Sequence, residues 1–551
     1  MDDFVSPAFR SYLTGEALDA RWQQPPLRTE KLRLLVYVAR EARRRYRGTP
    51  EHQTLGFEIG SRGAKAIRGW DPEAPRNDAG VRDLLHRISD ALYPGAFNID
   101  RYEAAVRIQV GPVPVPDPGP LARGRVTEIS ELGLPASFWE AARREREEGV
   151  GSDLVHVETG KPFNPKTDGR RLRERALEAA RTRREADTPE PTAALIDYLH
   201  ARAPRTFSDR VRRSVDDLVA TARETADDDV RHAELRSIRA LRLQPLPVYT
   251  TAARTQRVVP HGLGLQTAPT WVRRHVLDDC LELDMASAQL ALVAALWDVP
   301  DLRAFLAASL DGGPSWWAEL SGWLRRQFPG GTYDPDRHAD RLKGLLKTAT
   351  YGICFGMSER NVARWGNPKR MAAKEKVERE KDLRWLGRAF GARATADVGP
   401  RLLAYPLVAS LLAARDRRFE EIREAGALTD VFGREYRLGE RIRNREVTER
   451  SALAAEAQAA EHFVMLRAAQ PFLDEATRAQ TESTDERRVY PEAEIVLWQA
   501  DGFSVRVRQA RRERPWIEKA NAGLQKGCAD LRAVTGCPEV HTQVDAKFRP
   551  G

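Results

Sequence analysis

One stretch of sequence, Lys343 to Ser358, restricts what this chain can fold into more than any other. It reads KGLLKTATYGICFGMS, and as a helix it carries Lys343, Lys347 and Tyr351 four residues apart on a single face. Two ammonium groups one turn apart, next to an aromatic ring, suit a triphosphate with a base above it. An isolated pattern of this kind more often marks the solvated basic edge of an amphipathic helix. The residues after Tyr351 favour the first interpretation.

Two glycines flank Phe355 and complete the pattern K-x3-K-x3-Y-G-x2-F-G-M-S. This pattern resembles motif B, the nucleotide-binding fingers helix of family A DNA polymerases and of their single-subunit phage-type RNA polymerase relatives. The usual form is R-x3-K-x3-[FY]-G-x2-Y-G, so Lys343 replaces an Arg and Phe355 replaces a Tyr. The resemblance implies that Lys347, backed by Lys343, neutralises triphosphate charge and protonates the leaving pyrophosphate, while Tyr351 stacks on the incoming base.

Two aspartates flank this stretch, as the resemblance requires. The segment LELDMASAQLAL carries Asp284 and resembles motif A, in which an apolar strand delivers an Asp and a helix follows. The segment IVLWQADGFSVRV carries Asp501 and resembles motif C, a hairpin with an Asp at its turn. An Asp after a β-rich run is usually an edge or turn residue, but three motifs in the right order are hard to obtain by chance. The resemblance makes Asp284 and Asp501 the catalytic ligands of two Mg²⁺ ions, which activate a primer 3′-hydroxyl and stabilise pyrophosphate.

Further segments extend the resemblance over roughly residues 246–508. Tyr249 to Pro269 is similar to the family's T-G-R-x8-L-Q-N-x-P segment, and two later segments are similar to G-x-[VA]-x-T-x2-G-R and to the palm helix. The residues that the resemblance assigns to primer and template contacts are Arg257, Gln266, Arg434, Arg450 and Gln458. In the palm helix, Ala454 stands where most relatives have an Asn.

Composition is compatible with a polyanionic partner but does not establish one. Lys and Arg number 89 against 80 acidic residues, a net charge of +9 that is small for 551 residues. The four cysteines form no C-x2-C pair, which is typical of reduced thiols in the cytosol. The N-terminus shows no secretion signal and no 18-residue apolar run occurs, so we expect a cytoplasmic protein without membrane contact, from a bacterial, phage or plasmid context.

The expected fold class is α+β, a right-hand polymerase fold with an antiparallel palm sheet and helical fingers and thumb. The proline-rich segment GPVPVPDPGP, residues 111–120, predicts a linker that closes an N-terminal accessory region at 1–120. We expect that region to be mostly helical, and it offers a surface for a replication partner. Residues 121–245 predict a helical thumb-like region, and residues 246–551 predict palm and fingers, with fingers at about 298–400.

The predicted function is a template-directed DNA polymerase that acts on a DNA primer-template with deoxynucleoside triphosphates. A proofreading exonuclease is not expected, since the segment VHVET has His156 where a D-x-E-T opening needs its Asp. Two alternatives stay open: an RNA polymerase or primase of the same superfamily, and a non-catalytic nucleic-acid-binding protein with a polymerase fold. Motif C keeps the second alternative open, because the flanking His and Glu of many relatives are Ala500 and Gly502.

The sugar preference depends on a pair of residues that differ together. DNA-making relatives place a Glu five residues after the motif A Asp, where it blocks the ribose 2′-position and bonds to the motif B Tyr. Here Gln289 and Phe355 occupy those two positions. Since Phe355 offers no hydroxyl, we expect Gln289 to be freer and the exclusion of ribonucleotides to be weaker than in relatives.

Overall fold

The computed structural model describes a defined subset of the chain: residues 4–14, 35–36, 57–59, 98–102, 105–109, 126–130, 136–147, 149–150, 154–184, 188–201, 205–225, 228–252, 255, 257–262, 264–365, 373–442, 445–484, 489–499 and 502–547. Its contacts divide the chain into two units. Unit 1 comprises Met1–Arg175, Arg205–Leu246 and Leu263–Val276, and unit 2 comprises Ala176–Pro204, Pro247–Gly262 and Leu277–Gly551. One of these boundaries lies next to the predicted one at 245, and the predicted linker at 111–120 lies outside the described residues. The division into accessory region, thumb, palm and fingers stays a prediction.

Unit 1 combines short strands with paired helices. Its strands are β1 (Phe4–Val5), β2 (Phe57–Ile59), β3 (Asn98–Tyr102), β4 (Ala105–Gln109), β5 (Val126–Ser130) and β6 (Val155–His156). Its helices are α1 (Pro7–Thr14), α5 (Ala136–Glu147), α8 (Arg205–Arg223), α9 (Asp228–Leu243), α10 (Thr270–Val276) and the first part of α6 (Asp168–Arg181). The described residues of the N-terminal region 1–120 form helix α1 and strands β1 to β4, and three of these strands join β5 in a sheet of the order β2-β5-β4-β3. The expectation that this region is mostly helical stays a prediction.

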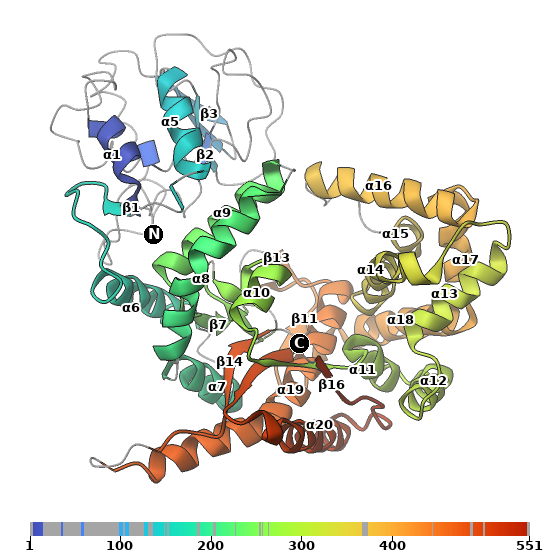
Figure 1. Ribbon diagram of the computed structural model, residues 1–551. Helices are drawn as coiled ribbons and strands as arrows, with labels where there is room; N and C mark the ends of the chain where they lie inside the picture. The colour runs from blue at the N-terminus through green and yellow to red at the C-terminus, as the bar shows by residue number, and fades with distance from the viewer. Residues whose placement is uncertain are drawn as a thin grey trace. The chain divides into compact units, whose positions relative to one another are not determined.

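Unit 2 holds most of the helices and one larger sheet (Figure 1). Its strands are β7 (Tyr249–Thr251), β8 (Val258–Pro260), β9 (Leu281–Met285), β10 (Ala427–Thr429), β11 (Glu435–Arg437), β12 (Arg441–Ile442), β13 (Arg445–Glu446), β14 (Ala493–Trp498), β15 (Gly502–Val507) and β16 (Val544–Lys547). Its helices are α7 (Glu190–Ala201), α11 (Ala288–Leu296), α12 (Pro300–Leu310), α13 (Trp316–Gln327), α14 (Pro335–Cys354), α15 (Glu359–Ala363), α16 (Ala373–Phe390), α17 (Gly399–Leu403), α18 (Pro406–Ala425), α19 (Glu449–Thr481) and α20 (Glu513–Thr535).

The larger sheet of unit 2 has the order β14-β15-β9-β16, and all three of its neighbouring pairs are antiparallel. β14 and β15 form the hairpin that the sequence predicts, and β9 pairs with β15 rather than with an element near it in the chain. The edge strand β14 is held by two buried or half-buried tyrosines, since Ile495 N donates to Tyr198 Oη at 3.1 Å and Trp498 N donates to Tyr249 Oη at 2.9 Å. These bonds satisfy edge N–H groups that would otherwise be open for pairing.

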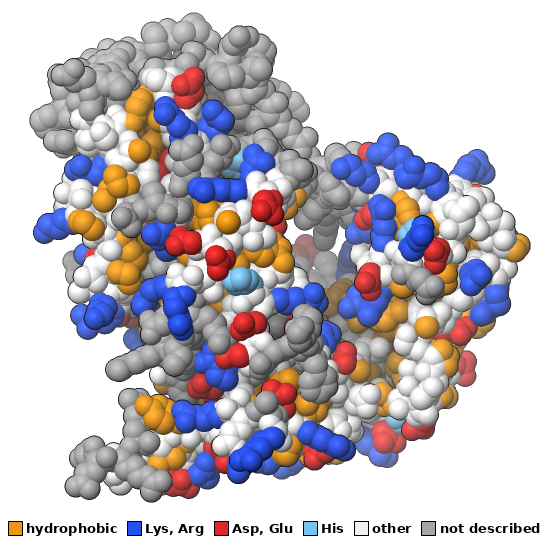
Figure 2. Space-filling model, in the orientation of Figure 1, with side chains coloured by type: hydrophobic (Ala, Val, Ile, Leu, Met, Phe, Trp, Pro, Cys, Tyr) orange, Lys and Arg blue, Asp and Glu red, His pale blue; other side chains and the backbone are white. Residues whose placement is uncertain are grey.

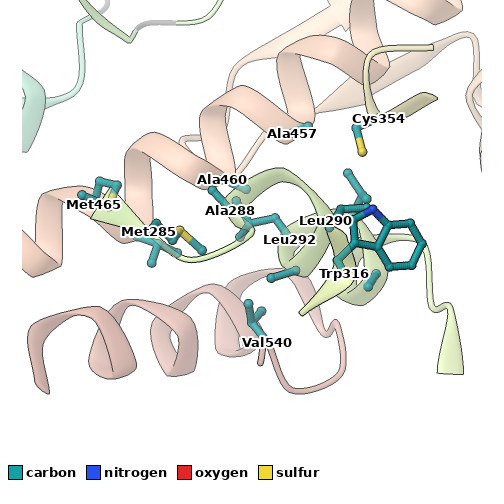
Figure 3. Close-up of a cluster of buried hydrophobic side chains, with 14 of the residues drawn as sticks. Met285, Ala288, Leu290, Leu292, Trp316, Cys354, Ala457, Ala460, Met465 and Val540 are labelled. Carbon is teal, nitrogen blue, oxygen red and sulfur yellow. The ribbon is translucent and has the colours of Figure 1, made fainter. Parts of the chain in front are cut away.

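The core of unit 2 fixes β9 and α11 in place. The sequence AQLALVAAL of α11 is apolar on all sides, and every residue from Ala288 to Ala295 is buried. A helix of this kind is stable only when other elements surround it. Helix α11 contacts α12, α14 and α19, and Figure 3 shows its Leu290 and Leu292 near Trp316 of α13. The predicted helix after the motif A strand is therefore confirmed, and it anchors the strand before it.

The mixed helical and sheet architecture agrees with the α+β expectation at that coarse level. Within the helical region predicted at 121–245, the described residues form α5, α6, α7, α8 and α9. Within the described residues, no helix is both long enough and apolar enough to cross a membrane.

Candidate functional site

The centre of the candidate site is Asp284 on β9. The alternation of the sequence LELDM buries Leu281, Leu283 and Met285 and leaves Glu282 and Asp284 on the opposite, more exposed face. Asp284 lies directly opposite Gly502, the first residue of β15. The strand that the motif A resemblance predicts is thus confirmed. Asp501, the predicted partner of Asp284, lies outside the described residues and directly precedes Gly502 in the chain.

Gly502 is required by the closeness of β9 and β15 at this point. A Cβ atom at residue 502 would lie 2.5 Å from the carbonyl oxygen of Leu283 and 3.2 Å from Oδ1 of Asp284. A contact of 2.5 Å between a Cβ and a carbonyl oxygen is far inside van der Waals distance, so another residue would push the strands apart. The glycine that departs from the usual motif C pattern therefore has a structural reason beside Asp284.

The C-terminal strand β16 brings two further charges to Asp284. Asp545 lies directly opposite Asp284 in the ladder, and Lys547 lies opposite Glu282. The Lys547 ammonium forms an ion pair of 2.7 Å with Oδ2 of Asp284. Burial lowers the pKa of Lys547, but the hydrogen bond to Asp284 and the charges of Asp284, Glu282 and Asp545 outweigh it, and the net effect raises this pKa. The sequence alone does not predict this strand, since VDAK is too short to show which strand it pairs with.

The residues on β9 fit a cation at this place. The Asp284 carboxylate already holds a positive group, the Lys547 ammonium, at 2.7 Å. Carboxylate oxygens are also the ligands that Mg²⁺ prefers. Within the described ranges, no three His, Cys, Asp or Glu side chains converge as a complete metal site. Asp284 can therefore supply one carboxylate ligand, and the contribution of Asp501 stays a prediction.

Helix α14 presents the predicted nucleotide-binding residues on one face. Lys343 and Lys347 are exposed and Tyr351 is half-buried, while the opposite face buries Leu342, Leu345, Leu346, Ala349 and Ile353. The helix predicted for the stretch at 343–358 is confirmed as far as Cys354, where α14 ends, together with the shared face of the two lysines and the tyrosine.

Trp317 of α13 lies beside two of these residues. Its ring meets the Tyr351 ring edge to face with centroids 5.8 Å apart, and the Lys347 ammonium is 6.0 Å from the Trp317 ring. An indole at this distance attracts an ammonium group through its π face. Trp316 is buried, but Trp317 is only half-buried and contributes to the cationic face of α14.

The end of α14 meets the start of α19. Phe355 follows the helix, and Gly356 has a φ of +72°, which glycine adopts without strain. A Cβ at residue 356 would also lie 2.8 Å from Cγ of Arg450, and Arg450 Nε donates to the Phe355 carbonyl oxygen at 3.4 Å. A cavity of about 580 Å³ opens here, lined by Phe355, Arg445, Glu446, Thr448, Arg450, Ser451 and Ala454. The structure thus brings Phe355 and Arg450 together.

Gln289 and Arg257 meet at Glu461, a residue that the sequence analysis did not single out. Gln289 Nε2 donates to Glu461 Oε1 at 2.5 Å, and Arg257 Nη2 lies 2.7 Å from Glu461 Oε2. Gln289 is 5% exposed and Glu461 is 2% exposed, so the network is buried. The expectation that Gln289 is freer for lack of a Phe355 hydroxyl is therefore wrong. A carboxylate on α19 holds the amide instead.

The remaining predicted contact residues are more dispersed. Arg434 follows Gly433 in the β10–β11 turn, where its guanidinium lies 5.7 Å from the Tyr436 ring. Gln458 is half-buried on α19, two turns beyond Arg450 on the same face. Gln266 belongs to unit 1 and Arg257 belongs to unit 2.

A second, basic groove lies away from all of these residues. It has a volume of about 630 Å³ and is lined by Leu383, Arg384, Gly387, Arg388, Gly391, Ala392, Arg393, Thr395, Ala396 and Asp397. Figure 2 shows Lys and Arg side chains gathered over α16, the helix that supplies part of this lining. Asp397 pairs with Arg393 at 3.8 Å.

Comparison with known proteins does not identify a family for this chain. No family model matches the chain, and no curated protein matches it in sequence. Among solved structures, the POL domain of Pol1 from M. smegmatis in complex with DNA primer-template and dNTP is similar at 14% identity and a TM-score of 0.36. The match covers 75% of this chain and 73% of that chain. A likeness of this degree does not define a family, and the function rests on the site itself.

Proposed function

We propose that the chain is a template-directed DNA polymerase of family A type, with residues 246–551 as palm and fingers. The observation that carries the proposal is the register of β9 against β15. Asp284 of the predicted motif A strand faces Gly502, the neighbour of the predicted motif C Asp501, in adjacent antiparallel strands. Two segments more than 200 residues apart in the chain therefore pair at Asp284 and Gly502, and this pairing supports the proposal.

The proposed reaction joins an incoming nucleotide to a primer 3′-hydroxyl. Mg²⁺ ions bound at Asp284 and Asp501 would supply activation of that hydroxyl and stabilisation of charge on the phosphates. Asp284 is suited to this role because its side chain is about a quarter exposed and already forms an ion pair with the Lys547 ammonium. The sheet around it and the core beneath it keep the carboxylate in one position, which favours transfer between fixed reactants.

In this proposal α14 binds the nucleotide through its exposed face. Lys343 and Lys347 offer two positive charges one turn apart for the triphosphate. Lys347 donates a proton to the leaving pyrophosphate. Tyr351 stacks on the base, and Trp317 supports its ring edge to face.

Primer and template are proposed to contact the start of α19 and its neighbours. Arg450 lines the cavity beside Phe355, and Gln458 continues the same helix face. Arg434 adds a positive charge from the β10–β11 turn. Phosphate contacts of this kind position a duplex but carry no sequence information, which suits an enzyme that copies any template.

The proposal is tested by measuring whether the template base determines which nucleotide is added. Four primer-templates that differ only in the first templating base are offered one dNTP at a time with Mg²⁺ and with EDTA. The proposal predicts addition of the complementary dNTP in each case and no addition with EDTA. Preference for NTPs would establish the RNA polymerase or primase alternative. Binding of the duplex without any addition would establish the non-catalytic alternative.

A further inference from the structure

The ion pair between Lys547 and Asp284 is the strongest feature of unit 2 that has no assigned role. Lys547 Nζ lies 2.7 Å from Asp284 Oδ2, although the two residues are 263 residues apart in the chain. Register places Lys547 opposite Glu282 and Asp545 opposite Asp284. Because directly opposite residues of an antiparallel pair share a face, these four side chains gather on one side of the sheet.

The charges on this face are unbalanced without Lys547. Asp284 and Asp545 are like charges directly opposite each other, an arrangement that destabilises a strand pair. Glu282 adds a third carboxylate two residues along the same strand and on the same face. The ammonium of Lys547 offsets part of this repulsion and holds the Asp284 carboxylate at one oxygen.

The ion pair between Lys547 and Asp284 is able to dissociate. The Lys547 side chain is 46% exposed and that of Asp284 is 26% exposed, so the pair is reached by water and by ions. Exposed ion pairs contribute little stability, because ordering a long side chain costs entropy and solvent screens the charges. A divalent ion carries twice the charge of the ammonium and competes well for the same carboxylate.

We propose that Lys547 is a resident counter-ion that gates metal binding at Asp284. In the free protein its ammonium occupies one oxygen of the Asp284 carboxylate. A divalent cation displaces it, and the released ammonium swings away on its flexible stem. The inference rests on the proposed function, in which Asp284 is a metal ligand, and it adds a competitor that sets how tightly the free protein binds metal.

Mn²⁺ binding to the free protein tests the gate without any catalytic turnover. The free Mn²⁺ signal in electron paramagnetic resonance is followed during titration of wild type, Lys547→Gln, Lys547→Arg and Lys526→Gln, with no DNA or nucleotide present. Lys526 is an exposed lysine of α20 and serves as the matched control. We expect Lys547→Gln to tighten Mn²⁺ binding up to about fivefold, because an exposed ion pair competes with at most about 1 kcal/mol. Lys547→Arg and Lys526→Gln should bind as wild type does.

Asp284→Asn in the wild-type and Lys547→Gln backgrounds shows whether the measured site is the intended one. Loss of binding in both assigns it to Asp284. If binding depends on Asp284 but Lys547→Gln binds as wild type or more weakly, the gate is overturned while the proposed metal site stands. If no variant shows binding that depends on Asp284, the gate and the proposed metal ligand both fail.

Discussion

The side-chain amide of Gln289 donates a hydrogen bond of 2.5 Å to Glu461, and Glu461 also holds Arg257 at 2.7 Å. Three elements of unit 2 meet in this network: α11, α19 and the segment before β8. A buried carboxylate that is both paired and hydrogen-bonded stabilises its surroundings only while both partners remain. The position of Gln289 is therefore determined by Glu461 and not by the residue at 355.

This network reverses the expected effect of restoring a Glu at position 289. Gln289→Glu places a second carboxylate against Glu461 in a buried site, so we expect a loss of stability on the order of 3 kcal/mol. Thermal unfolding measures the loss, with Gln509→Glu as an exposed control of the same chemistry. Gln289→Glu with Glu461→Gln should recover part of the stability, since the pair again has one amide and one carboxylate. Equal melting temperatures for Gln289→Glu and the control would contradict the network.

The same network bears on the choice of sugar. Because Glu461 holds Gln289, this side chain stays in position without a hydroxyl at residue 355. Phe355→Tyr alone should therefore change the ratio of dGTP to GTP incorporation by less than about twofold, a free-energy difference well under 1 kcal/mol. Gln289→Gly removes the side chain and should lower that ratio. Single-nucleotide incorporation opposite cytosine measures both variants. A large gain of discrimination in Phe355→Tyr would restore the argument from the missing hydroxyl.

The cationic face of α14 predicts a graded response to lysine substitutions. Lys347→Ala should reduce kcat/KM for dNTP by roughly ten- to a hundredfold, the value of one charged hydrogen bond. Lys347→Arg should retain part of the activity because the charge stays, and Lys526→Ala on the exposed face of α20 should match wild type. Steady-state incorporation kinetics provide the comparison. If Lys347→Ala behaves as Lys526→Ala does, α14 does not bind the triphosphate.

Gly502 predicts a steric penalty at the centre of the sheet. Gly502→Ala brings a Cβ to 2.5 Å from the Leu283 carbonyl oxygen, and overpacking of this kind costs roughly 1–3 kcal/mol. Gly330→Ala is the control, because a Cβ there meets nothing within 4 Å. Chemical denaturation compares the two free energies of unfolding. A Gly502→Ala protein as stable as the control would show that β9 and β15 are not so close at this point.

His462 predicts how stability depends on pH. Burial, together with the charge of Arg257, lowers the pKa of His462 from 6.5 to about 3, and its Nε2 lies 3.0 Å from Thr192 Oγ1. Below pH 6.5 the unfolded chain binds a proton at His462 that the folded chain does not. His462 therefore lowers the free energy of unfolding by up to roughly 1.4 kcal/mol for each pH unit as the pH falls. Above pH 6.5 this contribution is absent.

Denaturation curves at several pH values isolate this effect. As the pH falls below 6.5, the free energy of unfolding of His462→Gln should decrease less steeply than that of wild type. This comparison of slopes holds whatever the stability of the variant at neutral pH. His275 is exposed, so His275→Gln should leave the slope unchanged. An unchanged slope in His462→Gln would show that this histidine is protonated in the folded protein.

Local patterns carried most of what the sequence predicts correctly. The spacing of its own residues predicts helix α14, and the resemblance to motifs A and C predicts strand β9 and the β14–β15 hairpin. The alternation in LELDM identifies which residues share a face with Asp284 without any knowledge of the rest of the chain.

The partners of these residues depend on distant parts of the chain and could not be predicted. Lys547 is 263 residues from Asp284, and Glu461 is 172 residues from Gln289. Trp317 stands on a helix whose pattern indicates packing, and only the crossing of α13 and α14 brings it to Lys347. No period or motif records such pairings.

Nucleotide addition by Asp284→Asn tests the central claim most directly. The substitution keeps the side-chain size and removes one negative charge, so the fold and duplex binding should stay near wild type. Single-turnover extension of a saturated primer-template with Mg²⁺ should fall about a hundredfold or more, because a metal ligand supplies several kcal/mol to the transition state. Circular dichroism and duplex affinity measured on the same sample confirm that only chemistry is lost. Extension within about tenfold of wild type, a change of only about 1.4 kcal/mol, would contradict the assignment of Asp284 as a catalytic metal ligand.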